Sequence, residues 1–223
     1  MVYFVTGANR GIGLELVRLL IARGATVCAT VRDRASGLEL IDTGARVLEL
    51  DVADPASIDT LASRLGDLSI DVLINNAGVS STSKLLTDCR AEEFARVFAV
   101  NATGPVLVAR ALLPLLRKGS RKLIVNISSQ LASIRNNTGG SSYGYRASKA
   151  ALNMLTVSMA NELRPEGFTC VCMHPGWVKT RMGGDQAPMA VEQSARFILE
   201  QTDRFTPGDS GSFRNYDGST LPW

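Results

Sequence analysis

The chain has 223 residues, of which 45 % are hydrophobic and 20 % are charged, so it can bury a sizeable core and is not expected to be disordered. Its formal net charge is only +3 and no block of like charges occurs, which argues against nucleic acid or an anionic membrane as a partner. Apolar runs are short and broken by glycine or charge, so no membrane span is predicted.

The start of the chain and its cysteines indicate the compartment. A strand is expected to begin at Val2, which leaves no room for a signal peptide and points to the cytoplasm. The four cysteines lack CxxC spacing, and we expect reduced thiols that pack as small hydrophobic groups rather than a metal site. They are Cys28, Cys89, Cys170 and Cys172.

Apolar, β-rich runs alternate with helical patterns from one end of the chain to the other. Strands are predicted at 2–5, 25–31, 46–50, 71–74, 122–127, 168–174 and 211–215. Helices are predicted at 12–23, 55–65, 91–117, 144–164 and 191–201, with a weak one near 35–42. Ser57 or Asp54, with Pro55 beside it, marks the start of the helix at 55–65. The segments 130–143 and 181–190 are expected to be irregular.

The strands are apolar throughout and separated by helices, a pattern typical of a parallel sheet covered on both faces. Right-handed crossovers then give a doubly wound sheet, the Rossmann α/β fold. The sequence contains no internal repeat, linker or low-complexity segment. Residues 1–223 are therefore expected to form a single domain with a seven-stranded, mostly parallel sheet.

A glycine-rich turn, Thr6-Gly7-Ala8-Asn9-Arg10-Gly11-Ile12-Gly13, joins the first predicted strand to the first predicted helix. Such a turn permits tight backbone geometry and lets backbone N–H groups and a helix N-terminus meet a pyrophosphate. An ordinary strand–helix turn is the alternative. Three glycines at this spacing after a strand favour the nucleotide site.

The segment Tyr145-Arg146-Ala147-Ser148-Lys149 places a phenol and an ammonium four residues apart, on one face of a helix. A cationic neighbour favours the phenolate and lowers a tyrosine pKa from its usual value of about 10. Together with the glycine turn, this pair indicates a nicotinamide-dependent redox enzyme with a tyrosine acid/base. Tyr143 competes with Tyr145, but it lies six residues from Lys149 and faces elsewhere on a helix.

With these motifs the chain resembles the classical short-chain dehydrogenase/reductase family over nearly its whole length. The family's motifs occur in order, and the ordered set is far more specific than any one of them. They are the glycine turn, Asp51-Val52, Asn75-Asn76-Ala77-Gly78, Asn101, Ser128-Ser129, Tyr145 to Lys149, and Pro175-Gly176 followed by Thr180. The tail from Gly211 to Trp223 is also similar to the C-factor/sniffer-like carbonyl reductase branch.

The resemblance implies a cofactor site with Asp51 near the adenine, Asn76 to Gly78 beneath the cofactor, and Thr180 at the nicotinamide end. Two alternatives remain open: Asp51 as a helix or turn cap, and Asn75 and Asn76 as braces of the sheet. The predicted cofactor-binding residues are Gly7, Asn9, Arg10, Gly11, Ile12, Gly13, Arg32, Asp51, Val52, Asn76, Ala77, Gly78, Tyr145, Lys149, Pro175, Gly176, Val178 and Thr180.

The resemblance also implies a catalytic set, Asn101, Ser129, Tyr145 and Lys149. Tyr145 exchanges a proton with the substrate oxygen, and Lys149 depresses its pKa and bonds the nicotinamide ribose. Ser129 hydrogen-bonds the reacting oxygen, and Asn101 holds a water in a proton relay behind Lys149. Ser128 competes with Ser129, but alternation along a strand turns only one of them to the site, and the family pattern favours the second.

The expected cofactor is NADP(H). An NAD enzyme places an acidic residue at the end of the second strand, where this chain has Val31 followed by Arg32. Arg10 lies in the glycine turn, and two guanidiniums suit a 2′-phosphate. Asp33 is a counter-argument.

The predicted function is a carbonyl reductase or alcohol dehydrogenase, in which hydride passes between the nicotinamide and the carbon of a small carbonyl or alcohol substrate. A nucleotide-sensing or signalling protein with little turnover is the alternative. The intact catalytic set argues against it, because a sensor has no need of a proton relay.

Two departures from the family bear on the substrate pocket. The interval from Ser129 to Tyr145 is long, which extends the loop 130–143, and the segment after Thr180 is short. A short lid predicts an open, permissive pocket with apolar walls from Trp177, Met182 and Met189. His174 is expected to brace the core rather than to take part in catalysis.

The helices at 91–117 and 144–164 carry small or apolar residues on more than one face, which predicts a second packing partner. The family usually pairs these helices across a two-fold axis, so a homodimer or homotetramer is expected. The residues concerned are Ala99, Ala102, Val106, Ala109, Leu112 and Leu113, with Ala150, Ala151, Met154, Leu155, Val157 and Met159.

Overall fold

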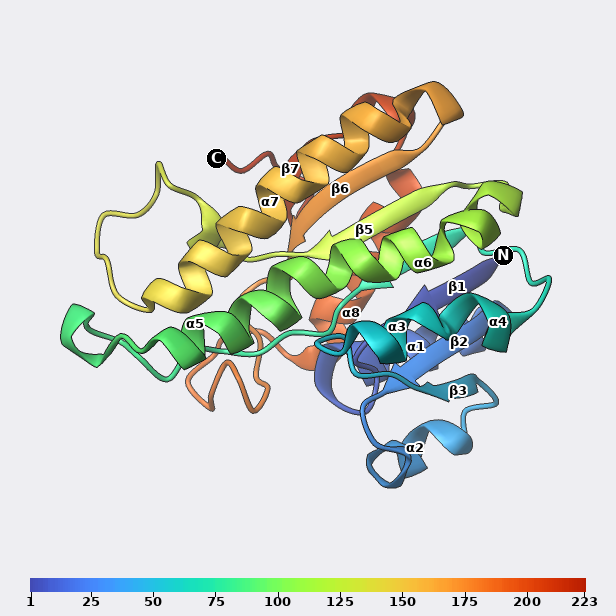
Figure 1. Cartoon of the computed structure of the whole chain (residues 1–223), viewed down its shortest axis with the longest axis horizontal. Helices are drawn as coiled ribbons and strands as arrows, with labels where there is room; N and C mark the ends of the chain where they lie inside the picture. The colour runs from blue at the N-terminus through green and yellow to red at the C-terminus, as the bar shows by residue number, and fades with distance from the viewer.

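A computed structural model describes the backbone of residues 1–223 and their side chains apart from those of Arg34 and Ser36. Seven strands form one sheet in the order β3-β2-β1-β4-β5-β6-β7, with every neighbouring pair parallel (Figure 1). This confirms the predicted single-domain, doubly wound fold. The strands are β1 (Val2–Val5), β2 (Thr26–Val31), β3 (Arg46–Glu49), β4 (Val72–Asn75), β5 (Leu123–Ile127), β6 (Thr169–His174) and β7 (Phe213–Asn215).

Two of the predicted helices are interrupted. The helix at 55–65 divides at Thr60, and the helix at 91–117 contains a π-helical turn, Ala99–Thr103. The helices are α1 (Gly11–Ala22), α2 (Leu38–Ile41), α3 (Pro55–Asp59), α4 (Leu61–Leu65), α5 (Ala91–Phe98), α6 (Gly104–Lys118), α7 (Tyr143–Leu163) and α8 (Val191–Arg204). Asp54 caps α3 by accepting a hydrogen bond from the Ala56 N–H at 3.0 Å, whereas the Ser57 hydroxyl accepts one from Asp51 N–H.

Side chains along each strand alternate between two buried layers. Val5, Ala29 and Ile74 belong to the layer that α1 and α8 cover, and Phe4 and Leu73 belong to the opposite layer, beneath α3, α4, α6 and α7. Figure 1 shows α6 and α7 in front of the sheet and α1 and α8 behind it. Burying both faces explains why the strands are apolar at consecutive positions.

In the described part of the chain, one helical stretch, Ala91–Lys118, is long and apolar enough to cross a membrane by length and composition. This corrects the expectation that every apolar run is too short. Half of its most apolar window is buried inside the protein. Val108, Leu112 and Leu116 belong to the core beneath α6, so packing against the sheet accounts for much of this hydrophobicity.

The four cysteines are free thiols, as predicted, and all but the half-buried Cys89 are buried. Burial raises the pKa of Cys170 and of Cys172 to about 12, so both stay protonated at neutral pH. Among the described residues, no group of three or more His, Cys, Asp or Glu side chains is placed to hold a metal.

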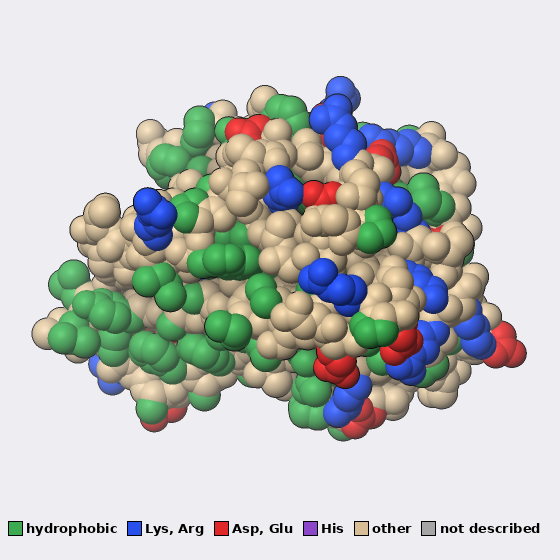
Figure 2. Space-filling model, turned by 90° about the horizontal axis from the view of Figure 1, so that it is seen from above, with side chains coloured by type: hydrophobic (Ala, Val, Ile, Leu, Met, Phe, Trp, Pro, Cys, Tyr) green, Lys and Arg blue, Asp and Glu red, His purple; other side chains and the backbone are tan. Residues whose placement is uncertain are grey.

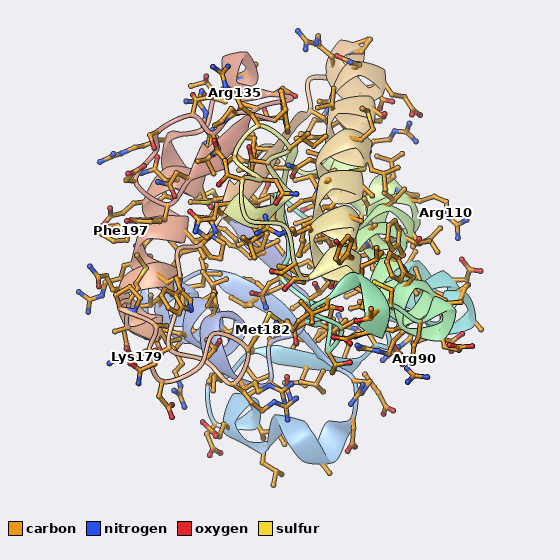
Figure 3. All side chains as sticks on the ribbon, turned by 90° about the vertical axis from the view of Figure 1, so that its left-hand side faces the viewer. Arg90, Arg110, Arg135, Lys179, Met182 and Phe197 are labelled. Carbon is orange, nitrogen blue, oxygen red and sulfur yellow. The ribbon has the colours of Figure 1, made fainter. Side chains whose placement is uncertain are left out.

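The topology gathers the sequence motifs at one edge of the sheet. The chain order reverses between β1 and β4, and in open parallel sheets ligands bind at the carboxyl ends of the strands beside such a point. The glycine turn follows β1, Asn76 to Gly78 follow β4, Ser128 and Ser129 follow β5, and Pro175 follows β6. Figure 3 views the molecule from this edge.

Candidate active site

The glycine turn is packed tightly against the segment that follows β4. A Cβ at Gly7 would lie 2.7 Å from the Cα of Ala77, and a Cβ at Gly13 would lie 2.4 Å from the carbonyl oxygen of Gly7. Gly7 also has a φ of 65°, a left-handed conformation that favours glycine. The Asn76 amide donates to the carbonyl oxygens of Thr6 and Gly7, both at 3.0 Å. The backbone before α1 is therefore held in place by the residues that directly follow β4.

Several residues predicted at the cofactor also make structural hydrogen bonds. The Asn75 amide donates to the Pro105 carbonyl at 3.2 Å and to Asn126 Oδ1 at 2.8 Å. Asp51 Oδ1 accepts a bond from the Ala53 N–H at 2.9 Å. Both alternatives considered from the sequence, bracing by the asparagines and capping by Asp51, are thus present in the structure.

Tyr145 lies in the first turn of α7. Its side chain is hydrogen-bonded to that of Ser129, which lies two residues after the end of β5. A hydrogen bond from the Ser129 hydroxyl lowers the pKa of Tyr145, but burial has the larger effect and raises that pKa above its ordinary value. The phenol is therefore protonated at neutral pH, which is the form that a general acid requires.

Lys149 lies one helical turn further along α7 and is only 4 % exposed. Its Nζ donates to the Ile127 carbonyl at 2.7 Å, and burial lowers its pKa to about 8. The net shift in the pKa of Tyr145 is upward, opposite to the shift expected from the Tyr–Lys spacing, because burial has the largest effect. The ammonium is directed to the Ile127 carbonyl, and burial of the phenol dominates its titration.

Asn101 is fully buried in the π-helical turn between α5 and α6. Its Oδ1 accepts from the Val79 N–H and its Nδ2 donates to the Val79 carbonyl, both at 2.9 Å, and Nδ2 also donates to Ser148 Oγ at 3.1 Å. A Cβ at Gly78 would lie 3.5 Å from Asn101 Oδ1 and 3.7 Å from Lys149 Nζ. Only a glycine lies between the amide and the ammonium.

A cleft of about 410 Å³ opens beside Tyr145 and Ser129. The predicted residues on its walls are Ile12, Ser129, Tyr145, Pro175, Gly176, Val178 and Thr180, with the expected apolar contributors Trp177 and Met182. Met189, which was also expected there, is absent from the described cleft lining, and its sulfur lies 2.7 Å from the position of a Cβ at Gly176. A cavity of about 490 Å³ elsewhere, lined by Met1, Tyr3 and Arg121 among others, contains none of the predicted site residues.

Sequence reasoning missed part of this cleft. Ser80, Ser81, Lys84 and Gly183 line it without having been expected there, whereas Gln130, Leu131 and Ser142 belong to the loop 130–143 that was expected beside the site. Residues 80–84 come soon after the Asn75 to Gly78 motif, so their position past the carboxyl end of β4 was an available signal. The predicted residues Arg32, Asp51 and Val52 follow β2 and β3 instead, and they lie outside the described cleft lining.

Ser128 and Tyr143, the alternatives to Ser129 and Tyr145 as catalytic residues, have other surroundings. Ser128 lines the cleft, but its hydroxyl donates to Asn153 Oδ1 at 2.7 Å. Tyr143 is 40 % exposed and is absent from the described cleft lining. His174 is 6 % exposed and packs edge-on against Tyr216, and burial lowers its pKa to about 4, so it is neutral at physiological pH. It lines the cleft from the end of β6.

The irregular segment 130–143 is fixed at both ends. The backbone N–H of Arg135 donates to the Trp223 carbonyl at 2.9 Å, and the Ser133 hydroxyl donates to the same oxygen at 3.3 Å. Near α7, the Ser142 N–H donates to the Lys84 carbonyl at 3.1 Å. The loop is therefore fixed by hydrogen bonds where it lines the cleft.

The family described as short chain dehydrogenase matches residues 1–190. The chain belongs to the short-chain dehydrogenase family. It is 47 % identical to C-signal of Myxococcus xanthus over 154 residues, which cover 69 % of this chain and 93 % of that protein. As a short-chain dehydrogenase, it is an oxidoreductase, as predicted.

Two solved structures are similar to this dehydrogenase over their whole length. The carbonyl reductase Sniffer of D. melanogaster superposes with a TM-score of 0.94 at 36 % identity, covering 100 % of this chain and 98 % of that one. An NADPH-bound carbonyl reductase from chicken fatty liver superposes with a TM-score of 0.92 at 35 % identity, covering 99 % and 98 %. These likenesses confirm the predicted C-factor/sniffer-like branch of the family.

Proposed function

We propose that the protein is an NADP(H)-dependent carbonyl reductase in which Tyr145 gives a proton to the substrate oxygen. The observation that carries this proposal is the meeting of Tyr145 and Ser129 in one cleft, with Lys149 behind them at the carboxyl ends of the strands. NADPH, when bound, supplies the hydride that reduces the carbonyl carbon. The substrate class is a small aldehyde or ketone, and the reverse reaction oxidises the alcohol.

Each catalytic residue has a defined part in this proposal. The Ser129 hydroxyl holds the carbonyl oxygen of the substrate against the protonated Tyr145. The Lys149 ammonium, held by the Ile127 carbonyl, stabilises the negative charge that develops on the phenol as its proton leaves. Asn101, bonded to Ser148 and close to Lys149 across Gly78, connects this ammonium to the relay that restores the proton.

The residues around the adenosine end favour NADP(H). Arg10 and Arg32 are exposed and form no ion pair among the residues that the structure describes. The Asp33 carboxylate, the counter-argument from the sequence, accepts a hydrogen bond from the Ala35 N–H at 3.0 Å and caps the turn after β2. A ribose 2′-phosphate would find two guanidiniums here. The NADPH in the chicken carbonyl reductase supports the same choice.

We expect NADPH to serve with a much higher kcat/KM than NADH. Arg32→Gln should weaken use of NADPH by about 10- to 100-fold, because a hydrogen bond to a charged group contributes about 1.5–3 kcal/mol. The same variant should leave the rate with NADH nearly unchanged. Initial rates of nicotinamide oxidation with a panel of aldehydes and ketones measure both values. Equal or better efficiency with NADH in the unmodified protein would contradict the assignment.

Carbonyl reduction should depend on pH through Lys149. The pKa of this ammonium is lowered to about 8, whereas the pKa of Tyr145 is raised, so both groups are protonated at about pH 7 and Lys149 deprotonates first as pH rises. The kcat for reduction should therefore be flat near neutral pH and fall above about pH 8. A pH profile at saturating NADPH and carbonyl substrate tests this. A rate of reduction that rises steadily through the alkaline range would contradict it.

The likeness to C-signal makes a signalling protein with little turnover the second candidate. The protonated Tyr145 phenol beside Ser129 supports the enzyme, because a protein that only senses a nucleotide has no need of a proton donor in the cleft. Steady consumption of NADPH in the presence of carbonyl compounds separates the two.

We also propose that the protein is a cytoplasmic homodimer, or a tetramer built from such dimers, held through α5, α6 and α7. Met154 on α7 is 67 % exposed, and Ala150, Leu155 and Val157 beside it remain partly exposed. Figure 2 shows hydrophobic side chains gathered toward one end of the visible face and most of the charges toward the other. Four residues expected at this interface, Ala102, Ala109, Leu112 and Met159, are buried within the single chain and leave the proposed set.

Light scattering at micromolar concentration should give at least twice the 23.9 kDa mass of one chain. Met154→Glu should shift the protein to the single-chain mass, because it places a charge in an apolar contact. Leu38→Glu is the matched control, since Leu38 on α2 is 66 % exposed and lies away from α7, and it should leave the mass unchanged. A single-chain mass for the unmodified protein would contradict the dimer.

A further inference from the structure

Three arginines from distant parts of the chain share one neighbourhood. Arg10 lies in the glycine turn, Arg32 follows β2, and Arg181 lies in the loop after β6. The contact that joins two of these segments is short: a Cβ at Gly11 would lie 3.4 Å from Cγ2 of Thr180. Arg10 and Arg181 each adjoin one member of this pair, so the loop after β6 brings a third guanidinium to the start of α1.

The electrostatics of Arg10 agree with this placement. Burial, then the charge of Arg181, then the charge of Arg32 lower the pKa of Arg10. Within the described residues, none of the three guanidiniums forms an ion pair with a carboxylate. Like charges gathered without a counter-charge repel one another, and a bound anion relieves that repulsion. Guanidiniums are the side chains best suited to phosphate.

The loop that carries Arg181 is held in its conformation by contacts among its own residues. Val178 and Met189 form a parallel bridge, and the Lys179 N–H donates to the Met189 carbonyl at 2.8 Å. Inside this closure, Trp177 Nε1 donates to the Gly183 carbonyl at 2.8 Å and the Gly183 N–H donates to Thr180 Oγ1 at 3.0 Å. Arg181 therefore extends from a preorganised turn, which lowers the entropy cost of using it in binding.

We propose that Arg181 is a cofactor-binding residue that engages the diphosphate bridge of the dinucleotide, while Arg10 and Arg32 engage the 2′-phosphate. This inference rests on the nucleotide site proposed above. Gly11 begins α1, and the N-terminus of a helix that follows such a turn is where a diphosphate binds. Thr180 contacts that position, so the loop that carries Arg181 lies beside the start of α1.

Arg181 and Arg32 bind different phosphates of the nucleotide. The diphosphate is common to NADPH and NADH, whereas the 2′-phosphate belongs to NADPH alone. Arg181 therefore increases the affinity for both nucleotides, and Arg32 discriminates between them. Lys179, two residues before Arg181, is the matched control, because Figure 3 shows it at the outer side of the molecule while Met182 lies toward the centre.

The test is a titration of the purified proteins with NADPH and with NADH, followed by tryptophan fluorescence. Arg181→Gln should raise the Kd for both nucleotides by about tenfold, the effect of one charge-assisted hydrogen bond. Lys179→Gln should stay within about twofold of the unmodified protein for both nucleotides, and Arg32→Gln should raise the Kd for NADPH alone. Thermal unfolding without nucleotide should show that Arg181→Gln remains folded.

Unchanged binding by Arg181→Gln, alongside binding by the unmodified protein, would overturn the assignment of Arg181 and leave the proposed function intact. A loss confined to NADPH would overturn it as well, because the arginine would then act on the 2′-phosphate. Failure of the unmodified protein to bind either nucleotide would instead overturn the proposed function together with this inference.

Discussion

Tyr145→Phe is expected to lower the kcat for carbonyl reduction by about 10³-fold while NADPH still binds. The ring and its packing remain, and only the oxygen that carries the proton is removed. The fall in kcat should therefore match the roughly 10²- to 10⁴-fold contribution that is typical of a general acid. The phenol is protonated at neutral pH because burial raises its pKa, so the residue is in the state that reduction requires.

The measurement is single-substrate kinetics at saturating NADPH, with the Kd for NADPH determined in parallel. Tyr143→Phe is the matched control, since it removes the same atom two residues away from a side chain that is 40 % exposed and outside the described cleft lining. Tyr143→Phe should keep nearly full activity. Turnover by Tyr145→Phe at the rate of the unmodified protein would disprove the mechanism.

Lys149→Ala is expected to impair both catalysis and cofactor binding. The resemblance to the family places this ammonium at the tyrosine and at the nicotinamide ribose, and the structure places it behind Tyr145 on the Ile127 carbonyl. We expect a kcat lowered by about 10²-fold or more, together with a raised Kd for NADPH. This pairing of defects distinguishes Lys149 from Tyr145, whose loss should affect kcat alone.

The unfolding temperature shows whether Lys149→Ala remains folded. Burying an ammonium costs free energy, so Lys149→Ala should unfold at a temperature close to that of the unmodified protein despite losing one hydrogen bond. Lys118→Ala removes an exposed lysine that pairs with Asp67 and should change neither kinetics nor nucleotide affinity. Lys149→Ala with full activity and tight NADPH binding would contradict its assigned role.

The strands and the order of the motifs were predictable because they depend on local patterns. Apolar runs such as Val2–Val5 and Thr26–Val31 need two covered faces, and a parallel sheet brings the segments after each run to one edge. The glycines at 7 and 13 were interpretable for the same reason, since their tight spacing serves a turn between strand and helix.

What the sequence did not reveal depends on contacts between distant segments. The π-helical turn at Asn101 lies where its amide bonds both backbone groups of Val79, 22 residues away, and no local pattern shows that contact. The pKa of Tyr145 was expected to fall because spacing shows the lysine, whereas its burial follows from the packing of the whole chain. The grouping of Arg181 with Arg10 likewise depends on the loop after β6 folding back onto α1.

The most direct test of the account is to follow the transferred hydrogen. NADPH deuterated at the transferable position of the nicotinamide is incubated with the purified protein and a panel of aldehydes and ketones, and the alcohol products are analysed by mass spectrometry. We expect deuterium on the carbinol carbon with the unmodified protein and with Tyr143→Phe, and almost none with Tyr145→Phe. Alcohol formed without deuterium on that carbon, or no consumption of NADPH with any carbonyl compound, would contradict it.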